Sequence, residues 1–140
     1  EFVARVTQIT GVTFRFGIAV NGAAGASSAH AAYFEYIQSA DTTAHYFTRD
    51  GSAQTDTGDT NFVVSNNQWN LYAIEYDGGT GDLTFKVDQV IRAVIPAATH
   101  AIDSLDNMQW FVDFATTTNT SNFDADYAAL ETNDMGPRDS

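Results

Sequence analysis

The sequence contains no cysteine, which excludes disulfide bonds, thiolate metal sites and cysteine nucleophiles. Basic residues are also scarce: 6 Lys and Arg stand against 18 Asp and Glu, giving a formal net charge of −12, and Lys86 is the single lysine. A field of this sign repels phosphate backbones and anionic headgroups, so we expect neither nucleic acid nor a membrane surface as a partner. It is compatible with a cationic partner, with bound divalent ions, or with carboxylates that only keep the surface hydrated.

Long apolar runs are missing as well. No segment approaches the ~20 residues of a membrane span, and no signal-peptide pattern opens the chain. The length of 140 residues suits one domain. We expect this domain to span residues 1–131 and residues 132–140 to form a loose tail. Because the chain opens with Glu1 directly in an alternating segment, we expect further residues to precede it in the full-length protein.

What the sequence has in abundance is apolar–polar alternation with a period of two. Every second residue of "VTFRFGIAV", residues 12–20, is apolar, so these side chains would share one face of a strand. Similar patterns predict strands at residues 2–7, 31–38, 44–49, 61–65, 69–76, 83–87, 89–95, 108–115 and 122–131. The Gly-, Ser-, Asp- and Thr-rich stretch before residue 61 is expected to be an exposed loop, and only residues 101–108 could form a helical turn. This pattern predicts an all-β, antiparallel sandwich or barrel.

One segment narrows the expectation. Residues 69–96, "WNLYAIEYDGGTGDLTFKVDQVIRAVIP", run from Trp69 through an alternating strand and a Gly-rich turn to "LTFKVD" and "QVIRAVIP". This order resembles concanavalin A-like jelly rolls, including laminin G-like and pentraxin-like domains, in which "F-x-V-D-G" follows a Trp-led strand and a Gly-rich turn. Asp88 is followed here by Gln89 where that pattern has Gly. The resemblance implies an antiparallel jelly-roll β-sandwich.

The chain more specifically resembles structural proteins of tailed bacteriophages that carry this jelly roll. The resembling stretches are "EFVARVTQITGVTFRFGIAV" at residues 1–20, residues 69–95, and "FDADYAALE" at residues 123–131. The resemblance implies a non-enzymatic protein of the virion surface: a capsid decoration or cement protein, or a head or tail fibre module. Its partners would be capsid or fibre proteins, together with further copies of itself in a homo-oligomer.

Two groups of carboxylates are candidates for calcium, which prefers several carboxylate and carbonyl oxygens. Asp113, Asp124 and Asp126 would converge if the two strands that carry them pair, and like charges that close need a cation. Asp77 and Asp82 bracket the Gly-rich turn and could wrap around an ion, although turn chemistry explains these residues without a ligand. No other cofactor is expected.

Two alternative functions remain open. The first is a calcium-assisted, lectin-like module that binds host glycans, within a secreted or virion protein. The second, less favoured, is a glycoside hydrolase, which needs a pair of carboxylates flanking the scissile bond. Glu35 and Glu75 each stand alone in their strands, and the 3 histidines show neither zinc-ligand nor Ser-His-Asp spacing. We therefore predict that the chain is not an enzyme.

Strands that are apolar on both faces indicate either central burial or a contact between subunits. The segments "QWFVDF" and "YFEYI" have this pattern, which makes Trp110, Phe111, Tyr33 and Tyr36 candidates for an interface. A sugar would instead need an exposed aromatic platform. By residue type, the candidates for such a platform are Trp69, Trp110, Tyr33, Tyr46 and Tyr72.

Overall fold

The computed structural model describes residues 1–20, 30–38, 43–50, 53–100, 102, 108–117 and 121–129. Its strands are β1 (Phe2–Val6), β2 (Val12–Val20), β3 (His30–Ile37), β4 (Thr43–Asp50), β5 (Ala53–Val63), β6 (Asn70–Tyr76), β7 (Leu83–Val87), β8 (Val90–Ile95), β9 (Met108–Thr116) and β10 (Phe123–Ala128), with a 3-10 turn, η1 (Ala97–Thr99). Among these residues, no helix is long and apolar enough to cross a membrane. The expected tail and most of the expected helical turn lie outside the described residues.

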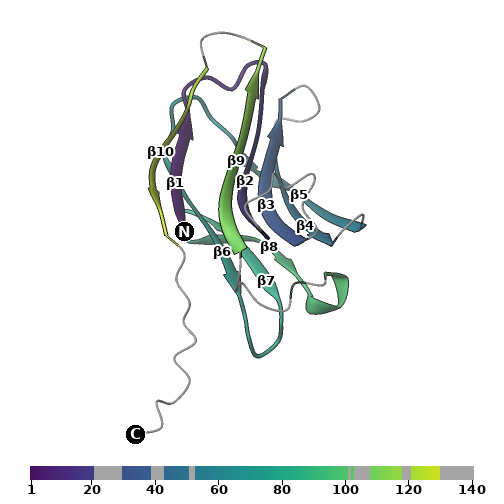
Figure 1. Ribbon diagram of the computed structural model, residues 1–140. Helices are drawn as coiled ribbons and strands as arrows, with labels where there is room; N and C mark the ends of the chain where they lie inside the picture. The colour runs from purple at the N-terminus through teal and green to yellow at the C-terminus, as the bar shows by residue number, and fades with distance from the viewer. Residues whose placement is uncertain are drawn as a thin grey trace, which may run out of the picture.

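The strands form two antiparallel, five-stranded sheets that pack face to face (Figure 1). Sheet A has the order β10-β1-β6-β7-β8, and sheet B has the order β5-β4-β3-β2-β9. The first two strands run beside the last two, because β1 pairs with β10 in sheet A and β2 pairs with β9 in sheet B. Beyond the paired residues, the backbone N–H of Ala129 donates to the carbonyl of Glu1 at 2.9 Å. The predicted all-β, antiparallel sandwich is thus confirmed.

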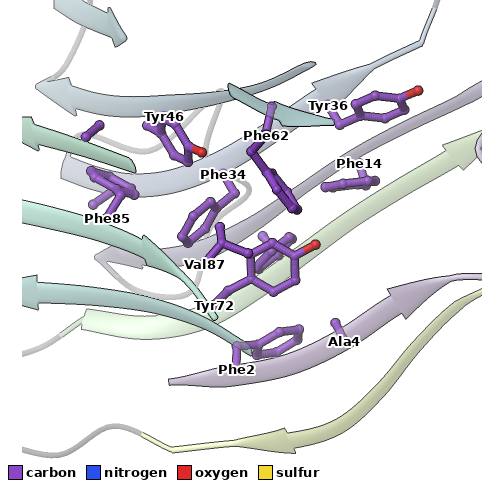
Figure 2. Packing of buried hydrophobic residues seen from close by; sticks show 14 of the residues in the cluster. Phe2, Ala4, Phe14, Phe34, Tyr36, Tyr46, Phe62, Tyr72, Phe85 and Val87 are labelled. Carbon is purple, nitrogen blue, oxygen red and sulfur yellow. The ribbon is translucent and has the colours of Figure 1, made fainter. Parts of the chain in front are cut away.

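The main core fills the space between the two sheets, and the alternation of each strand builds it. On β2, Phe14 and Phe16 are at most 2% exposed, and the intervening residues face the other side. Aromatic rings meet edge to face across the sheets. The ring centroids of Phe16 and Tyr72 are 4.7 Å apart, and those of Phe34 and Phe85, which Figure 2 shows, are 5.3 Å apart. Such rings bury the largest apolar areas in a core, so they dominate its stabilisation.

Most predicted strands are confirmed to within a residue or two, but the loop expected before residue 61 is wrong. Ala53–Val63 is one 11-residue edge strand, β5, whose first seven residues pair with β4. Thr55 and Thr57 lie half-buried on its inner side, while Gln54 and Asp56 are exposed. The alternation therefore exists, but threonine supplies the inward positions, and a β-branched side chain suits a strand even when it is polar.

The β7–β8 hairpin closes with Asp88 and Gln89, which adopt φ angles of 52° and 66°. Two successive positive φ angles characterise a type I′ turn, for which Asn-Gly is favoured. The Asp88 carboxylate accepts hydrogen bonds from the backbone N–H of Leu71 at 2.8 Å and from the side chain of Asn70 at 2.7 Å. Asp88 thus fastens the turn to β6, whereas Gln89 occupies a conformation that suits glycine better.

Replacing Gln89 with Gly should raise the free energy of unfolding by about 0.5 kcal/mol. A left-handed conformation costs a non-glycine residue about 1–2 kcal/mol, and glycine removes this strain from the folded state. Glycine also makes the unfolded chain more flexible, which lowers the free energy of unfolding by about 0.4–1 kcal/mol. Urea denaturation measures the difference. The control variant Asp88→Gly loses both carboxylate hydrogen bonds and should be less stable than the wild type. A Gln89→Gly protein that is also less stable would show that the turn is not strained.

Sheet B carries a second, smaller apolar cluster on the face turned away from the main core, consisting of Ala19, Ala31, Tyr33, Phe47 and Phe111. The ring of Tyr33 stacks on Phe47 at 5.2 Å and meets Phe111 edge-on at 5.9 Å. Gly17 lies between Tyr33 and Phe111 in the strand register. A Cβ atom on Gly17 would lie 2.6 Å from the Cα of Tyr33 and would overlap the carbonyl oxygen of Ala32. Glycine at this position therefore lets β2 and β3 approach each other.

The Gly17→Ala variant should lose about 1–3 kcal/mol of stability, because the added methyl group meets backbone that cannot move without disturbing the sheet. Gly78→Ala is the matched control, since a Cβ there meets nothing within 4 Å; it should change stability by less than about 0.5 kcal/mol. Thermal unfolding followed by circular dichroism compares the two variants. Equal effects at both positions would refute the packing explanation for Gly17.

Candidate functional site

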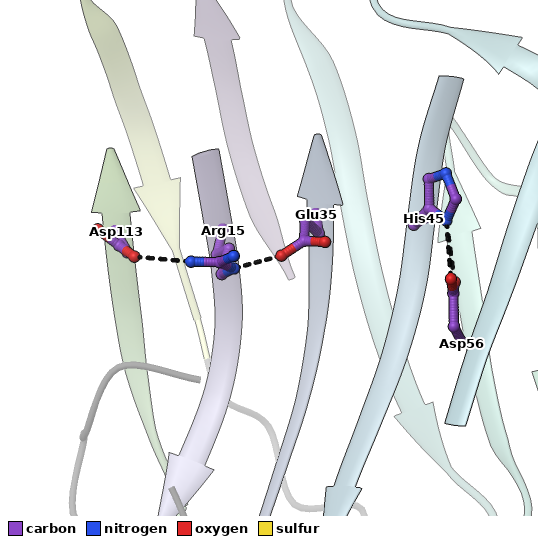
Figure 3. Close-up of polar contacts among 5 residues, drawn as sticks. All are labelled: Arg15, Glu35, His45, Asp56 and Asp113. Carbon is purple, nitrogen blue, oxygen red and sulfur yellow. Dashed lines mark hydrogen bonds and ion pairs between the residues drawn. The ribbon is translucent and has the colours of Figure 1, made fainter. Parts of the chain in front are cut away.

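Polar side chains, most of them charged, form a row across sheet B on the face turned away from the main core (Figure 3). The register places Asp113, Arg15, Glu35 and His45 opposite one another on β9, β2, β3 and β4. Arg15 donates through Nε to Glu35 and through Nη1 to Asp113 at 3.3 Å. At the other end, His45 Nδ1 lies 2.9 Å from Asp56 Oδ1 on β5. We call these five residues the polar row.

Ion pairing and partial burial shift the pKa values of Arg15 in the polar row and of the neighbouring Tyr33. The side chains of Arg15 and Glu35 are only 23% and 14% exposed. Partial burial lowers the pKa of Arg15, but its hydrogen bonds to Glu35 and Asp113 and the charge of Glu35 outweigh burial and raise that pKa above its usual value. Burial, aided by the charge of Glu35, likewise raises the pKa of the Tyr33 hydroxyl, against smaller opposing effects of Arg15 and Arg49. Arg15 therefore remains a cation and Tyr33 a neutral phenol.

The polar row does not match the geometry of a glycoside hydrolase. Such an enzyme needs two carboxylates across an open gap that admits the sugar and, in inverting enzymes, a water molecule. Glu35 and Asp113 instead have the guanidinium of Arg15 hydrogen-bonded between them. Glu75, the other isolated glutamate, accepts a hydrogen bond from Lys86 at 2.7 Å on sheet A.

Replacing Arg15 should lower the free energy of unfolding, because the carboxylates of the polar row then lose their cation. The Arg15→Met variant leaves Glu35 charged, largely buried and without its guanidinium, and we expect a loss of about 1–3 kcal/mol. The control is Lys86→Met, whose partner Glu75 is 53% exposed, so the loss should stay below about 1 kcal/mol. Adding Glu35→Gln to Arg15→Met should recover part of the stability, as measured by urea denaturation. No recovery would mean that packing of the arginine, not its charge, holds the row.

The structure separates the first group of calcium candidates. β9 is an edge strand of sheet B and β10 an edge strand of sheet A, and they do not pair, so the pairing that this group required is absent. Asp113 is bound to Arg15, and Asp124 accepts a hydrogen bond from Arg5 Nε at 2.9 Å. Asp126 is exposed at an irregularity in the β1–β10 register. Within the described part of the chain, no group of three or more His, Cys, Asp or Glu residues could hold a metal ion.

The carboxylates of the second group of calcium candidates, Asp77 and Asp82, accept hydrogen bonds from backbone N–H groups in and next to their own hairpin. Asp77 Oδ1 accepts hydrogen bonds from the N–H groups of Gly79 at 2.8 Å and Thr80 at 3.3 Å, and these bonds lower the pKa of the carboxyl group. Asp82 Oδ1 accepts from the N–H of Ala97 at 3.1 Å, which ties the hairpin to η1. These hydrogen bonds are typical of an Asp-capped turn.

The four interface candidates divide between the two faces of sheet B. Tyr36 is buried in the main core, and Trp110 packs against that core with its ring 5.5 Å from Phe2. Tyr33 and Phe111 belong to the second cluster and are 1% and 6% exposed. None of the four is an openly exposed aromatic ring. Among the other candidates for a sugar platform, Tyr46 and Tyr72 are buried in the main core, and Trp69 is 43% exposed.

A different apolar surface lies on sheet A, on the face turned away from the core. Val3 of β1 is paired with Tyr127 of β10 and Leu71 of β6, and Ile91 and Val94 of β8 are paired with outward-facing residues of β7. Trp69 covers the outward-facing Arg5, with 4.7 Å from guanidinium carbon to ring centroid. We call this surface the apolar face of sheet A, and its members are Val3, Trp69, Leu71, Ile91, Val94 and Tyr127. Four of them are strongly exposed: Trp69 (43%), Tyr127 (46%), Val94 (49%) and Ile91 (58%).

An irregularity in β8 creates part of this face. Ile91 and Val94 are three residues apart, so a regular strand would point them to opposite sides. The β7–β8 register shifts at Arg92, which brings both aliphatic side chains to the outer face. Arg92 itself turns toward β5, where its guanidinium lies 5.2 Å from the ring centroid of Phe62. Strict alternation did not signal this surface, because the sequence does not mark the bulge.

No protein-family model matches this chain, and no curated protein is significantly similar to it in sequence.

Proposed function

We propose that this protein is a non-enzymatic structural module of a tailed-bacteriophage virion, a capsid decoration or fibre component of the concanavalin A-like jelly-roll type. It works through protein–protein contacts and carries out no reaction. The observation that carries the proposal is the apolar face of sheet A, where exposed aliphatic and aromatic side chains gather on one rigid sheet. Exposed apolar side chains that share one face of a sheet are typical of a protein-contact site.

The resemblance to phage structural proteins concerns the same part of the molecule. Its three stretches, residues 1–20, 69–95 and 123–131, contain every strand of sheet A, together with β2. Most of the carboxylates that could support the enzymatic or lectin-like alternatives are instead hydrogen-bonded within the protein: Glu35 and Asp113 to Arg15, and Asp77 to its own turn. A sandwich of this kind contributes stable surfaces, and burial of apolar area against a shell or fibre would supply the binding energy.

The test asks whether the chain is a component of particles. Mass spectrometry of gradient-purified virions from the source of the sequence should find it in many copies per particle. Antibodies raised against the purified chain should label intact particles in electron micrographs. A chain that is absent from particles refutes the virion role.

The same purified chain tests the alternatives directly. We expect no binding on a glycan array, no cleavage of polysaccharides, and no change in melting temperature with millimolar calcium. A calcium-dependent rise that disappears in Asp77→Asn or Asp124→Asn, together with glycan binding, would favour the lectin-like module. Polysaccharide cleavage that Glu35→Gln abolishes would favour the hydrolase.

A further inference from the structure

The apolar face of sheet A differs from the molecule as a whole in its charge. Four charged side chains lie among its apolar residues, and they form two ion pairs: Arg5 with Asp124 at 2.9 Å, and Lys86 with Glu75 at 2.7 Å. Their formal charges cancel, whereas the chain carries a net charge of −12. The exposed Asp126, next to Tyr127 on β10, adds one further carboxylate. This face therefore contains two of the 6 Lys and Arg residues and only a small share of the 18 Asp and Glu residues.

This charge balance indicates which partner the face would accept. Two copies of a strongly acidic chain repel each other wherever their unpaired carboxylates approach. This repulsion is smallest at a surface whose charges are mostly paired and whose exposed residues are largely apolar. A cationic partner would instead be attracted to the acidic remainder of the surface. The face is thus better suited to a second copy of this chain.

We propose that two copies of the chain pack through the apolar face of sheet A about a twofold axis, sheet against sheet. In such an isologous contact each copy offers the same patch. The most exposed aliphatic side chains of the face, Ile91 and Val94, would be buried in it, and the two ion pairs would remain internal to each copy. The inference deepens the proposed function and rests on it, because it names the contact through which a structural module would form a homo-oligomer.

Sedimentation velocity of the purified chain over a range of concentrations and salt tests the contact. The dimer fraction should rise with protein concentration, and it should rise further in 1 M salt because screening reduces the repulsion between acidic copies. Ile91→Glu should weaken the dimer about tenfold or more, since each dimer then buries two new carboxylates. Val63→Glu is the matched control: Val63 is 55% exposed but lies on β5 of sheet B, and this variant should dimerise like the wild type.

A second measurement keeps the test decisive if Ile91→Glu disturbs folding. Because the chain has no cysteine, Ile91→Cys introduces a single thiol. Its reaction with a thiol reagent should slow as protein concentration rises, whereas the thiol of Val63→Cys should react at a constant rate. A wild-type chain that stays monomeric at several hundred micromolar overturns the proposal, as does a dimer in which the thiol of Ile91→Cys stays fully reactive.

These outcomes are separable from those for the virion role. A chain that is found in particles but is monomeric in solution loses this inference and keeps the proposed function. A chain that dimerises through this face but is absent from particles keeps the contact and loses the virion role.

Discussion

The structure depends on the burial of one side of each sheet against the other. Phe16 lies at the centre of this contact: its ring stacks on Phe2 at 5.1 Å and lies 4.7 Å from Tyr72 and 5.7 Å from Phe123, all of which belong to sheet A. Because a strand side chain can face only one side, this burial commits every second residue to the core. The remaining residues form two outer faces that are free to differ.

The two outer faces differ in how far their apolar residues are exposed to solvent. On sheet B, Arg15 neutralises carboxylates on both neighbouring strands, and Tyr33 and Phe111 are buried beside Gly17. On sheet A, Arg5 and Lys86 pair with carboxylates in the same way, and Ile91, Val94 and Tyr127 are exposed to solvent. The strongly exposed aliphatic residues of sheet B, Val63 and Val112, lie on its two edge strands. Burial of solvent-exposed apolar side chains at a contact is favourable. Burial of charges that are already paired contributes little to binding. This contrast favours sheet A as the working surface.

Local patterns predicted much of this fold, and long-range pairing explains what they missed. Residues 12–20 form a strand over the predicted range. The period-two alternation of "VTFRFGIAV" places all its large apolar side chains on one face only if the segment is a strand. Residues 53–60 of β5 were predicted as a loop because threonines occupy inward positions there, whereas residues 61–63 lie in a predicted strand. The convergence of Asp113 with Asp124 could not be judged locally, since it depends on which strands pair across the whole chain. The bulge at Arg92 had no sequence signal, and it decides where Ile91 points.

An experimental structure of the protein in its assembled form, determined by electron cryomicroscopy, is the most direct test of whether sheet A is the working surface. If it is, Ile91, Val94 and Tyr127 will be buried at a contact with another copy or with a shell protein. Arg15, Glu35 and Asp113 will then keep their mutual ion pairs away from that contact. An assembly that buries the polar row and leaves Ile91 and Val94 in solvent would contradict this assignment.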